Sequence, residues 1–178
     1  AGTTTVTVKS TDRYGAEVTA VINVTVTGNH APVATDGALS TNEDTADRGI
    51  LNATDSDAGN TLTFSIEQQP SKGTVVITGL NNGAYTFNPG LDFQNLGAGD
   101  TQTVTFTFKS TDNLGVPSLV KTVTVTVNGI NDVPEGADAS FATDQDNTVS
   151  GTLTATDVDT GDTIVGFATV TQPKIPIA

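Results

Sequence analysis

Apolar and polar residues alternate along most of the chain with a period of two. Residues 104–108 and 123–127 alternate valine or phenylalanine with threonine. This alternation is typical of strands that bury one face. The same pattern recurs in several shorter runs, at 6–8, 22–26, 62–66, 75–77 and 85–87. We therefore expect about seven short strands per hundred residues, and no long helices, because threonine and valine favour strands.

Turn-forming residues separate the predicted strands. Pro70–Gly73, Asn82-Gly83 and Asn88–Gly90 each lie between two apolar runs and are typical of tight turns. Short strands that each bury one face are accommodated by two antiparallel sheets packed against each other. The predicted fold class is therefore all-β, an immunoglobulin-like sandwich. The chain has no Cys and no Trp, so Val, Ile, Leu and Phe must fill the core and the threonine faces must meet solvent.

The sequence contains an internal repeat. Residues 5–15 (TVTVKSTDRYG) match residues 105–115 (TFTFKSTDNLG) at an offset of 100, and residues 49–57 match residues 151–159 at an offset of 102. The small drift is what insertions in loops produce. A period of about 102 residues is the size of one sandwich domain.

The repeat predicts three parts. Residues 1–29 are the C-terminal strands of a preceding repeat, residues 30–132 are one complete sandwich, and residues 133–178 are the N-terminal part of a following repeat. We expect the chain to be an excerpt of a longer tandem array. The last part is too short to bury much core by itself.

The composition excludes several classes of function. There are 20 acidic and 7 basic residues, for a net charge of −13, so the chain would repel nucleic-acid backbones. It has no apolar run long enough for membrane insertion. The absence of Cys and the single His rule out thiolate sites and a multi-histidine zinc site within one chain. The composition is compatible with a secreted surface protein.

Many of the acidic residues lie at predicted turns and links. Asp55 and Asp57 follow a strand, and Asp157 and Asp159 repeat this pair in the next copy. Clustered carboxylates repel one another unless a cation offsets them, and Ca²⁺ takes six to eight oxygen ligands. The alternative is that Asp, Asn and Gly simply form turns here. Because the set recurs in both copies, we favour Ca²⁺ at the seams between sandwiches.

Three stretches resemble the VCBS and cadherin-like repeats of large, RTX-type bacterial surface adhesins. They are residues 53–60 (ATDSDAGN), 110–115 (STDNLG) and 125–134 (VTVNGINDVP). The resemblance implies tandem cadherin-like sandwiches with Ca²⁺ at each junction, on an extracellular protein of the bacterial cell surface.

The resemblance also implies which residues hold the metal. At the first junction, around Asn29, the ligands would be Asn29, Asp55, Asp57 and Asp112. At the second junction, around residue 131, they would be Glu43, Asn131, Asp132, Asp157 and Asp159. Asp92 is a less specific candidate for a ligand within the domain. His30 replaces the Asp that the family has in the first link, and Gln145 stands where Glu43 stands one repeat earlier. We therefore expect the second junction to bind Ca²⁺ more strongly than the first.

These observations favour a structural role. The predicted function is a stalk or fibre, stiffened by Ca²⁺, that extends a binding region or supports cell–cell and biofilm contact, with neighbouring repeats as partners and no enzymatic activity. Homotypic contact between arrays is a variant. One alternative is a carbohydrate-binding module for surface glycans, although two Tyr and seven Phe leave few aromatic residues for it. A second alternative is a filament subunit whose copies complement one another by strand addition.

Overall fold

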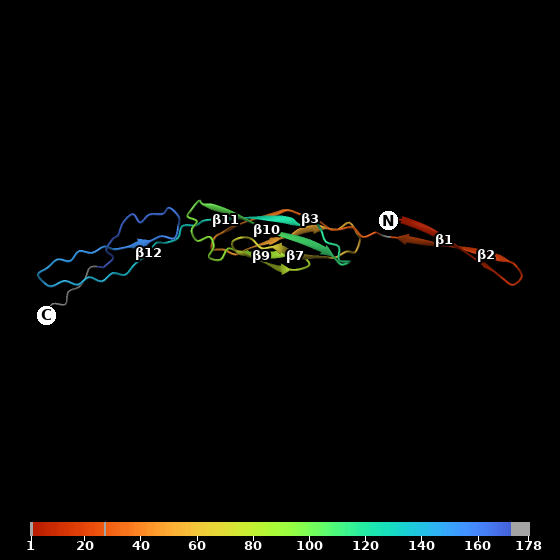
Figure 1. The fold of residues 1–178 in the computed structure, drawn as a ribbon, viewed down its shortest axis with the longest axis horizontal. Coiled ribbons are helices and arrows are strands. Elements are labelled where there is room, and N and C mark those ends of the chain that lie inside the picture. Colours follow the sequence, from red (N-terminus) through yellow and green to blue (C-terminus); the bar gives the residue numbers. More distant parts are fainter. Residues whose placement is uncertain (1, 27, 172–178) are drawn as a thin grey trace.

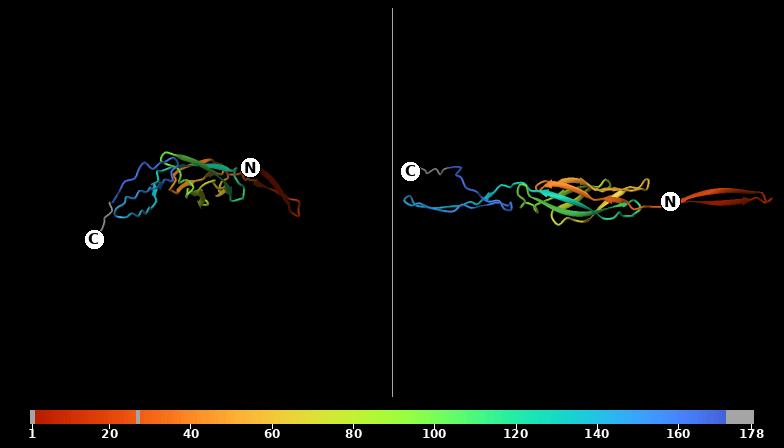
Figure 2. Two further views of the ribbon diagram at one scale, coloured as in Figure 1. Left: turned by 60° about the vertical axis from the view of Figure 1, so that its left-hand side comes forward. Right: turned by 90° about the horizontal axis from the view of Figure 1, so that it is seen from above.

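The computed structural model describes residues 2–26 and 28–171, which form an elongated molecule (Figure 1). A central β-sandwich lies between a hairpin at the N-terminal end and an irregular segment at the C-terminal end, and two further views show the same order (Figure 2). The described residues contain strands but no helix, which confirms the predicted all-β class. Within this part of the chain there is accordingly no helix that could cross a membrane.

One face of the sandwich is a four-stranded sheet in the order β4–β11–β10–β7. The strands are β4 (Gly37–Asn42), β7 (Leu62–Gln68), β10 (Thr101–Asp112) and β11 (Lys121–Asn128). β11 and β4 run parallel, whereas β10 pairs antiparallel with both β11 and β7. This sheet contains the longest alternating runs of the sequence, and it positions the ends of β7, β10 and β11 beside the links to the neighbouring parts.

The opposing face is a three-stranded sheet in the order β5–β9–β8, with a separate two-stranded ladder of β3 and β6. The strands are β3 (Val33–Thr35), β5 (Asp47–Ile50), β6 (Asn52–Thr54), β8 (Thr74–Gly79) and β9 (Ala84–Asn88). Residues 33–54 thus form four short strands, β3 to β6, which raises the strand number above the predicted seven. Leu51 lies between β5 and β6, which belong to different sheets. Its N–H donates to the Gly83 carbonyl, and its side chain is buried.

The core is built from the alternating residues of both sheets. Phe106 and Phe108 of β10 and Val125 of β11 are almost completely buried, while the threonines between them face outward. The ring of Tyr85 on β9 meets Phe106 edge-on with ring centroids 5.2 Å apart, which joins the two sheets. The buried residues of the hydrophobic core that the structure describes all lie between Ala34 and Val127. The division into 1–29, 30–132 and 133–178 stays a prediction, and this core falls within its middle part.

The two ends repeat pieces of the central sandwich. β1 (Gly2–Thr11) and β2 (Glu17–Val26) form the N-terminal hairpin and pair only with each other. In the C-terminal segment (residues 133–171), the strands are β12 (Glu135–Gly136) and β13 (Ala155–Thr156). Their pairing of Glu135 with Thr156 copies that of Val33 with Thr54 at an offset of 102. The sequence repeat is therefore also a repeat of local backbone structure.

Candidate metal sites at two junctions

The predicted ligands gather in two clusters at opposite ends of the central sandwich. The first junction lies where the N-terminal hairpin joins the sandwich, and the second lies where the C-terminal segment begins (Figure 1). Each cluster combines residues of the link with residues from loops at that end of the domain. The assignment of Glu43 to the far junction, away from the pair Asp55 and Asp57, agrees with this placement.

At the first junction, hydrogen bonds tie the link to two loops of the sandwich. The Asn29 side-chain amide donates to Asp112 Oδ2 over 2.7 Å. The Asn60 amide donates to Asn29 Oδ1 over 3.2 Å and to Asp55 Oδ2 over 3.3 Å. The structure therefore brings together Asn29, Asp55 and Asp112, as predicted from the sequence, and adds Asn60, which was not singled out as a ligand.

His30 occupies the remaining side of the first junction. Its backbone N–H donates to Asp57 Oδ2 over 2.5 Å, and its ring Nδ1 lies 2.8 Å from Asp57 Oδ1. At the second junction, Asp132 takes the equivalent place, with its N–H donating to Asp159 Oδ2 over 2.9 Å. The backbone arrangement is thus the same, but the first junction has an imidazole where the second has a carboxylate.

Two carboxylates of the first junction, Asp57 and Asp112, are stabilised in their charged forms. The two hydrogen bonds from His30 lower the pKa of Asp57. For Asp112, loss of solvent is the largest single influence and would raise the pKa, but hydrogen bonds from Asn29 and from the backbone of residues 114–116 together lower it. Both groups are acceptors of well-formed hydrogen bonds, so neither needs a metal ion to hold it in place.

At the second junction, three carboxylates converge. One oxygen from each of Glu43, Asp132 and Asp159 lies within 4.8 Å of the others, and Asp157, Asp159 and Asp162 form an overlapping group. Among the described residues, no such group of three forms at the first junction. Asp157 also positions Asp159, because its Oδ1 accepts the Asp159 N–H over 3.0 Å.

Burial distinguishes this cluster from an ordinary acidic turn. Glu43 has no exposed surface, and Asp159 is 3% exposed. Glu43 Oε1 accepts the Ile130 N–H over 2.9 Å. In contrast, Glu43 Oε2, Asp132 Oδ2 and Asp159 Oδ1 are buried and accept no hydrogen bond from the described residues. A buried oxygen without a partner is costly, and one such oxygen on each of three converging carboxylates indicates a site built for a positive charge.

The electrostatics of the second junction are opposite to those of the first. Loss of solvent raises the pKa of Glu43, and the charges of Asp132 and Asp44 raise it further, although the Ile130 hydrogen bond offsets part of this effect. Loss of solvent also raises the pKa of Asp132, followed by repulsion from Asp159, Asp44 and Asp157. None of the ion pairs among the described residues involves Glu43, Asp132 or Asp159.

A loop of the central sandwich, residues 91–100, completes the second junction and was not predicted from the sequence. The Asn95 carbonyl accepts the Thr160 N–H over 3.0 Å, and the Asn95 amide donates to Thr160 Oγ1 over 3.3 Å. Gln94 of the same loop donates to Asp44 Oδ1 over 2.7 Å. The two Asn95 contacts join the sandwich to the C-terminal segment, whereas the Gln94 contact holds the loop to Asp44 within the sandwich. No motif marked these contacts, because one of them uses only backbone atoms and the others use the amides of Asn95 and Gln94.

Two predicted residues lie outside the clusters. The Asn131 side chain is exposed, and its amide donates to the Asp132 carbonyl over 2.6 Å. Asp92 accepts the Gly73 N–H over 2.7 Å, which stabilises the turn before β8. Their roles as metal ligands stay predictions.

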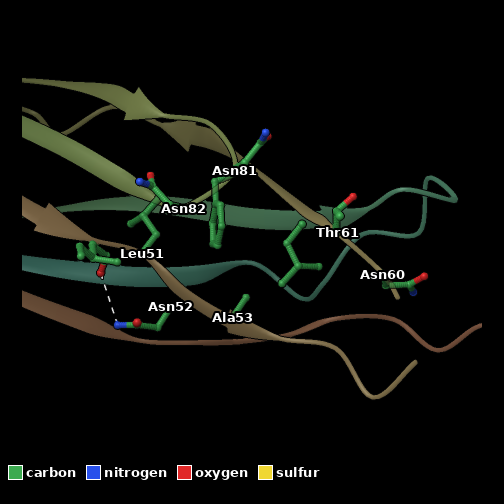
Figure 3. A pocket seen from close by; sticks show the side chains of 10 residues that line it. Leu51, Asn52, Ala53, Asn60, Thr61, Asn81 and Asn82 are labelled. Atoms are coloured by element: carbon green, nitrogen blue, oxygen red, sulfur yellow. Dashed lines mark hydrogen bonds between the residues drawn. The ribbon is translucent and has the colours of Figure 1, made fainter. Parts of the chain in front are cut away.

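A separate hollow of about 520 Å³ lies beside β6 and the start of β7 (Figure 3). Asn52, Asn81, Asn82 and Thr61 line its polar side (Figure 3), and the buried residues Leu51 and Phe64 form its apolar side. Such amides can bond a neutral polar ligand, but the lining presents no exposed aromatic ring on which a sugar could stack. Glycan binding therefore stays a prediction.

The chain is similar to solved structures of adhesion proteins, among them the following two. Protocadherin gamma B2 extracellular cadherin domains 1–5 is 18% identical, with a TM-score of 0.47, and the match covers 90% of this chain and 32% of that chain. The sialic acid binding region of the Streptococcus sanguinis SK1 adhesin, bound to 3'sLn, is 15% identical, with a TM-score of 0.39, and the match covers 69% of this chain and 37% of that one. The chain thus spans about a third of the length of either structure.

The family comparison is more specific. No curated protein matches the chain. The family model described as "Bacterial cadherin-like domain" matches residues 29–129, which is more than half of the 178 residues and coincides with the central sandwich. The VCBS and RTX context of the sequence resemblance stays a prediction, whereas its cadherin-like part is confirmed. The chain belongs to the family of bacterial cadherin-like domains.

Proposed function

We propose that this chain is part of an extracellular bacterial adhesion protein in which Ca²⁺ stiffens successive cadherin-like sandwiches into a stalk. The observation that carries the proposal is the second junction, where the carboxylates of Glu43, Asp132 and Asp159 converge and each has one buried oxygen that accepts no hydrogen bond from the described residues. In this role the chain is a spacer that projects a binding region or supports contact between cells, rather than a catalyst.

The chemistry of the donor set fits a hard divalent cation. All the converging donors are carboxylate oxygens, which suit Ca²⁺ and not a soft metal. The raised pKa values of Glu43 and Asp132 indicate that these two carboxylates lack a neighbouring positive charge, which the bound ion would supply. Plain turn formation explains exposed aspartates, but it gives no reason to bury Glu43 completely. Glu43, Asp132 and Asp159 would hold the ion at the second junction, with Asp157 positioning Asp159.

The three proposed ligands come from different parts of the chain, so an ion bound to all of them would hold those parts together. Glu43 follows β4 of the sandwich, Asp132 belongs to the link, and Asp159 belongs to the C-terminal segment. An ion held by all three would restrict the orientation of one domain relative to the next. Without the ion, repulsion among the carboxylates favours separation. Extracellular modules of this kind need only weak sites, with Kd about 10⁻⁴ to 10⁻³ M.

Calorimetric titration of the full chain with CaCl₂ tests the proposal. We expect Glu43→Gln to remove the tighter binding event, because it deletes a charged ligand of the second junction. The matched control is Glu67→Gln, the same change at an exposed residue paired with Lys109, which should bind Ca²⁺ as the unmodified chain does. Equal Ca²⁺ binding by the Glu43→Gln chain would reject the second junction as the site.

A further inference from the structure

One edge of the central sandwich is closed by a side chain instead of a strand. Among the described residues, β8 is the last strand of the sheet β5–β9–β8 and pairs only with β9. On its outer side, Gln69 Oε1 accepts the Val75 N–H over 2.9 Å, and Gln69 Nε2 donates to the Val75 carbonyl over 2.9 Å. These are the two bonds that a residue of a neighbouring antiparallel strand would make. The Gln69 amide therefore takes the place of a strand.

Two further features hold this edge closed. Gln69 precedes Pro70, which is buried, and a residue before proline is restricted to extended backbone. The Gln69 side chain therefore starts from a restricted position beside β8. Two residues before Val75, the Gly73 N–H donates to Asp92 Oδ2 over 2.7 Å. Side chains from two separate loops thus bond backbone groups at the start of β8.

The sequence of β8 is suited to pairing with another strand. Residues 74–78 (TVVIT) are all β-branched, and no residue of β8 is charged, although the chain carries a net charge of −13. Val76 is 61% exposed. An uncharged edge strand of this composition pairs readily with another chain unless something blocks it. The usual blocking residues, an edge lysine or proline, are absent from β8.

We propose that Gln69 blocks the edge of β8, and that two copies of the sandwich pair side by side through β8 when the Gln69 amide is removed. The strand is self-complementary. Because backbone groups alternate in direction along a strand, those of Ile77 point the same way as those of Val75. A twofold axis at Val76 would pair Val75 of one copy with Ile77 of the other and bring the two exposed Val76 side chains together.

This contact lies away from both junctions. The strands of the sandwich run along the long axis of the molecule (Figure 1), so the edge of β8 faces sideways. In the proposed array, neighbouring domains attach at the two ends of the sandwich and supply no strand here. Past the end of β8, the Phe64 N–H donates to the Leu80 carbonyl over 3.0 Å, which limits the available edge to β8 itself. Gln69 would therefore keep adjacent stalks from joining edge to edge.

Sedimentation of the full chain over a range of concentrations tests the block. Gln69→Ala removes both bonds to Val75, and we expect it to dimerise at least about tenfold more tightly than the unmodified chain. Gln68→Ala is the matched control, because Gln68 is the adjacent glutamine and is exposed like Gln69, but the bonds to Val75 come from Gln69. It should associate like the unmodified chain.

Thermal melting of the same two variants separates the block from a purely structural role. If Gln69 serves only to hold the turn after β7, its loss lowers the melting temperature and leaves the association equal to that of Gln68→Ala. That result overturns the proposal.

Disulfide trapping locates the contact. The chain has no Cys, so Val76→Cys in the Gln69→Ala chain gives each copy one thiol at the twofold axis. Opposite residues of a non-hydrogen-bonded pair have Cα atoms about 4.5 Å apart, a spacing that a disulfide can bridge. We expect a linked dimer with oxidised glutathione, and much less of it with Thr78→Cys, which is exposed as well but would lie opposite residue 74 of the other copy. Equal trapping at both positions, or at neither, overturns the proposal.

A charge on the edge should prevent the pairing. Val76→Lys added to Gln69→Ala would place two lysines face to face in the dimer, and it should return the monomer. The matched control is Ile50→Lys in the same background, because Ile50 is 63% exposed but lies on β5, at the opposite edge of the sheet. It should still dimerise. If both lysine variants dimerise equally, the edge of β8 is not the interface and the proposal fails.

Discussion

At the scale of single residues, Glu43 is a charged group held in an environment that disfavours its charge. Its folded-state pKa is raised above 4.5, so in the absence of Ca²⁺ the native state binds more protons than the unfolded state above that pH. Stability in EDTA should therefore fall as pH rises through this window. The pKa values of Asp57 and Asp112 are lowered from 3.8, so these two groups reduce stability only as pH decreases below about that value. The effect of Glu43 and the effect of the two aspartates therefore occur in different pH ranges and can be measured separately.

We predict that Glu43→Gln stabilises the chain in EDTA at neutral pH, although it weakens Ca²⁺ binding. An amide can donate to the neighbouring carboxylates, which removes the cost of an unsatisfied buried group, about 1 kcal/mol. Thermal melting in EDTA at pH ~5 and ~7 measures this gain, expected as a rise of roughly 4–8 °C at the higher pH. A lower melting temperature for the variant at neutral pH would show that the Glu43 carboxylate is not strained.

His30 decides the strength of the first junction. We predict that His30→Asp tightens Ca²⁺ binding there about tenfold, or about 1.4 kcal/mol, because it restores the carboxylate that Asp132 provides at the second junction. The same change should lower stability in EDTA, since the new charge faces Asp57. Calorimetry compares it with His30→Asn, which removes the imidazole without adding charge. Identical affinities for the two variants would mean that charge at position 30 does not limit binding.

At the scale of elements, strands with a local alternating pattern could be predicted from the sequence, whereas elements placed by contacts with distant residues could not. The strands around Phe106 and Val125 were predictable because alternation and burial coincide there. β5 was not, because Asp47 to Ile50 carry no alternating pattern and are placed by pairing with β9, where the Tyr85 ring covers Gly49. The loop 91–100 was also missed, because Leu96 and Gly97 contact the end of β11 through their carbonyl oxygens.

This close contact gives a prediction for Gly129. A Cβ at this position would run into the carbonyl oxygens of Leu96 and Gly97, so Gly129→Ala should push the loop away from the second junction and cost about 1–3 kcal/mol. At the equivalent Gly28 of the first junction, a Cβ would have open space, so Gly28→Ala should change stability little. Denaturant unfolding of the two variants compares these costs, and a Gly129→Ala chain as stable as Gly28→Ala would contradict the packing argument.

At the scale of the whole molecule, the repeat predicted which residues are equivalent but not how the two junctions differ. Asp57 and Asp159 occupy the same position in successive repeats, yet the first is held by hydrogen bonds from His30 and the second faces Glu43 and Asp132. This difference arises because the loop 91–100 of the sandwich packs against the second junction, through Asn95 on Thr160 and Gly97 beside Asp159. A comparison of motifs alone could not reveal it, since burial is a property of the assembled ends.

Shape and stability should therefore respond to Ca²⁺ together. With a Kd of about 10⁻⁴ to 10⁻³ M, roughly 10 mM Ca²⁺ should stabilise the molecule by about 1.4–2.7 kcal/mol. Small-angle scattering, at a concentration where the chain is monomeric, should show a longer and less variable particle in Ca²⁺ than in EDTA. Because Mg²⁺ demands a stricter octahedral geometry, equal Mg²⁺ should screen charge without the same extension. A particle whose dimensions and melting temperature are the same in Ca²⁺, Mg²⁺ and EDTA would show that the acidic clusters do not clamp the junctions, and that packing alone keeps the molecule extended.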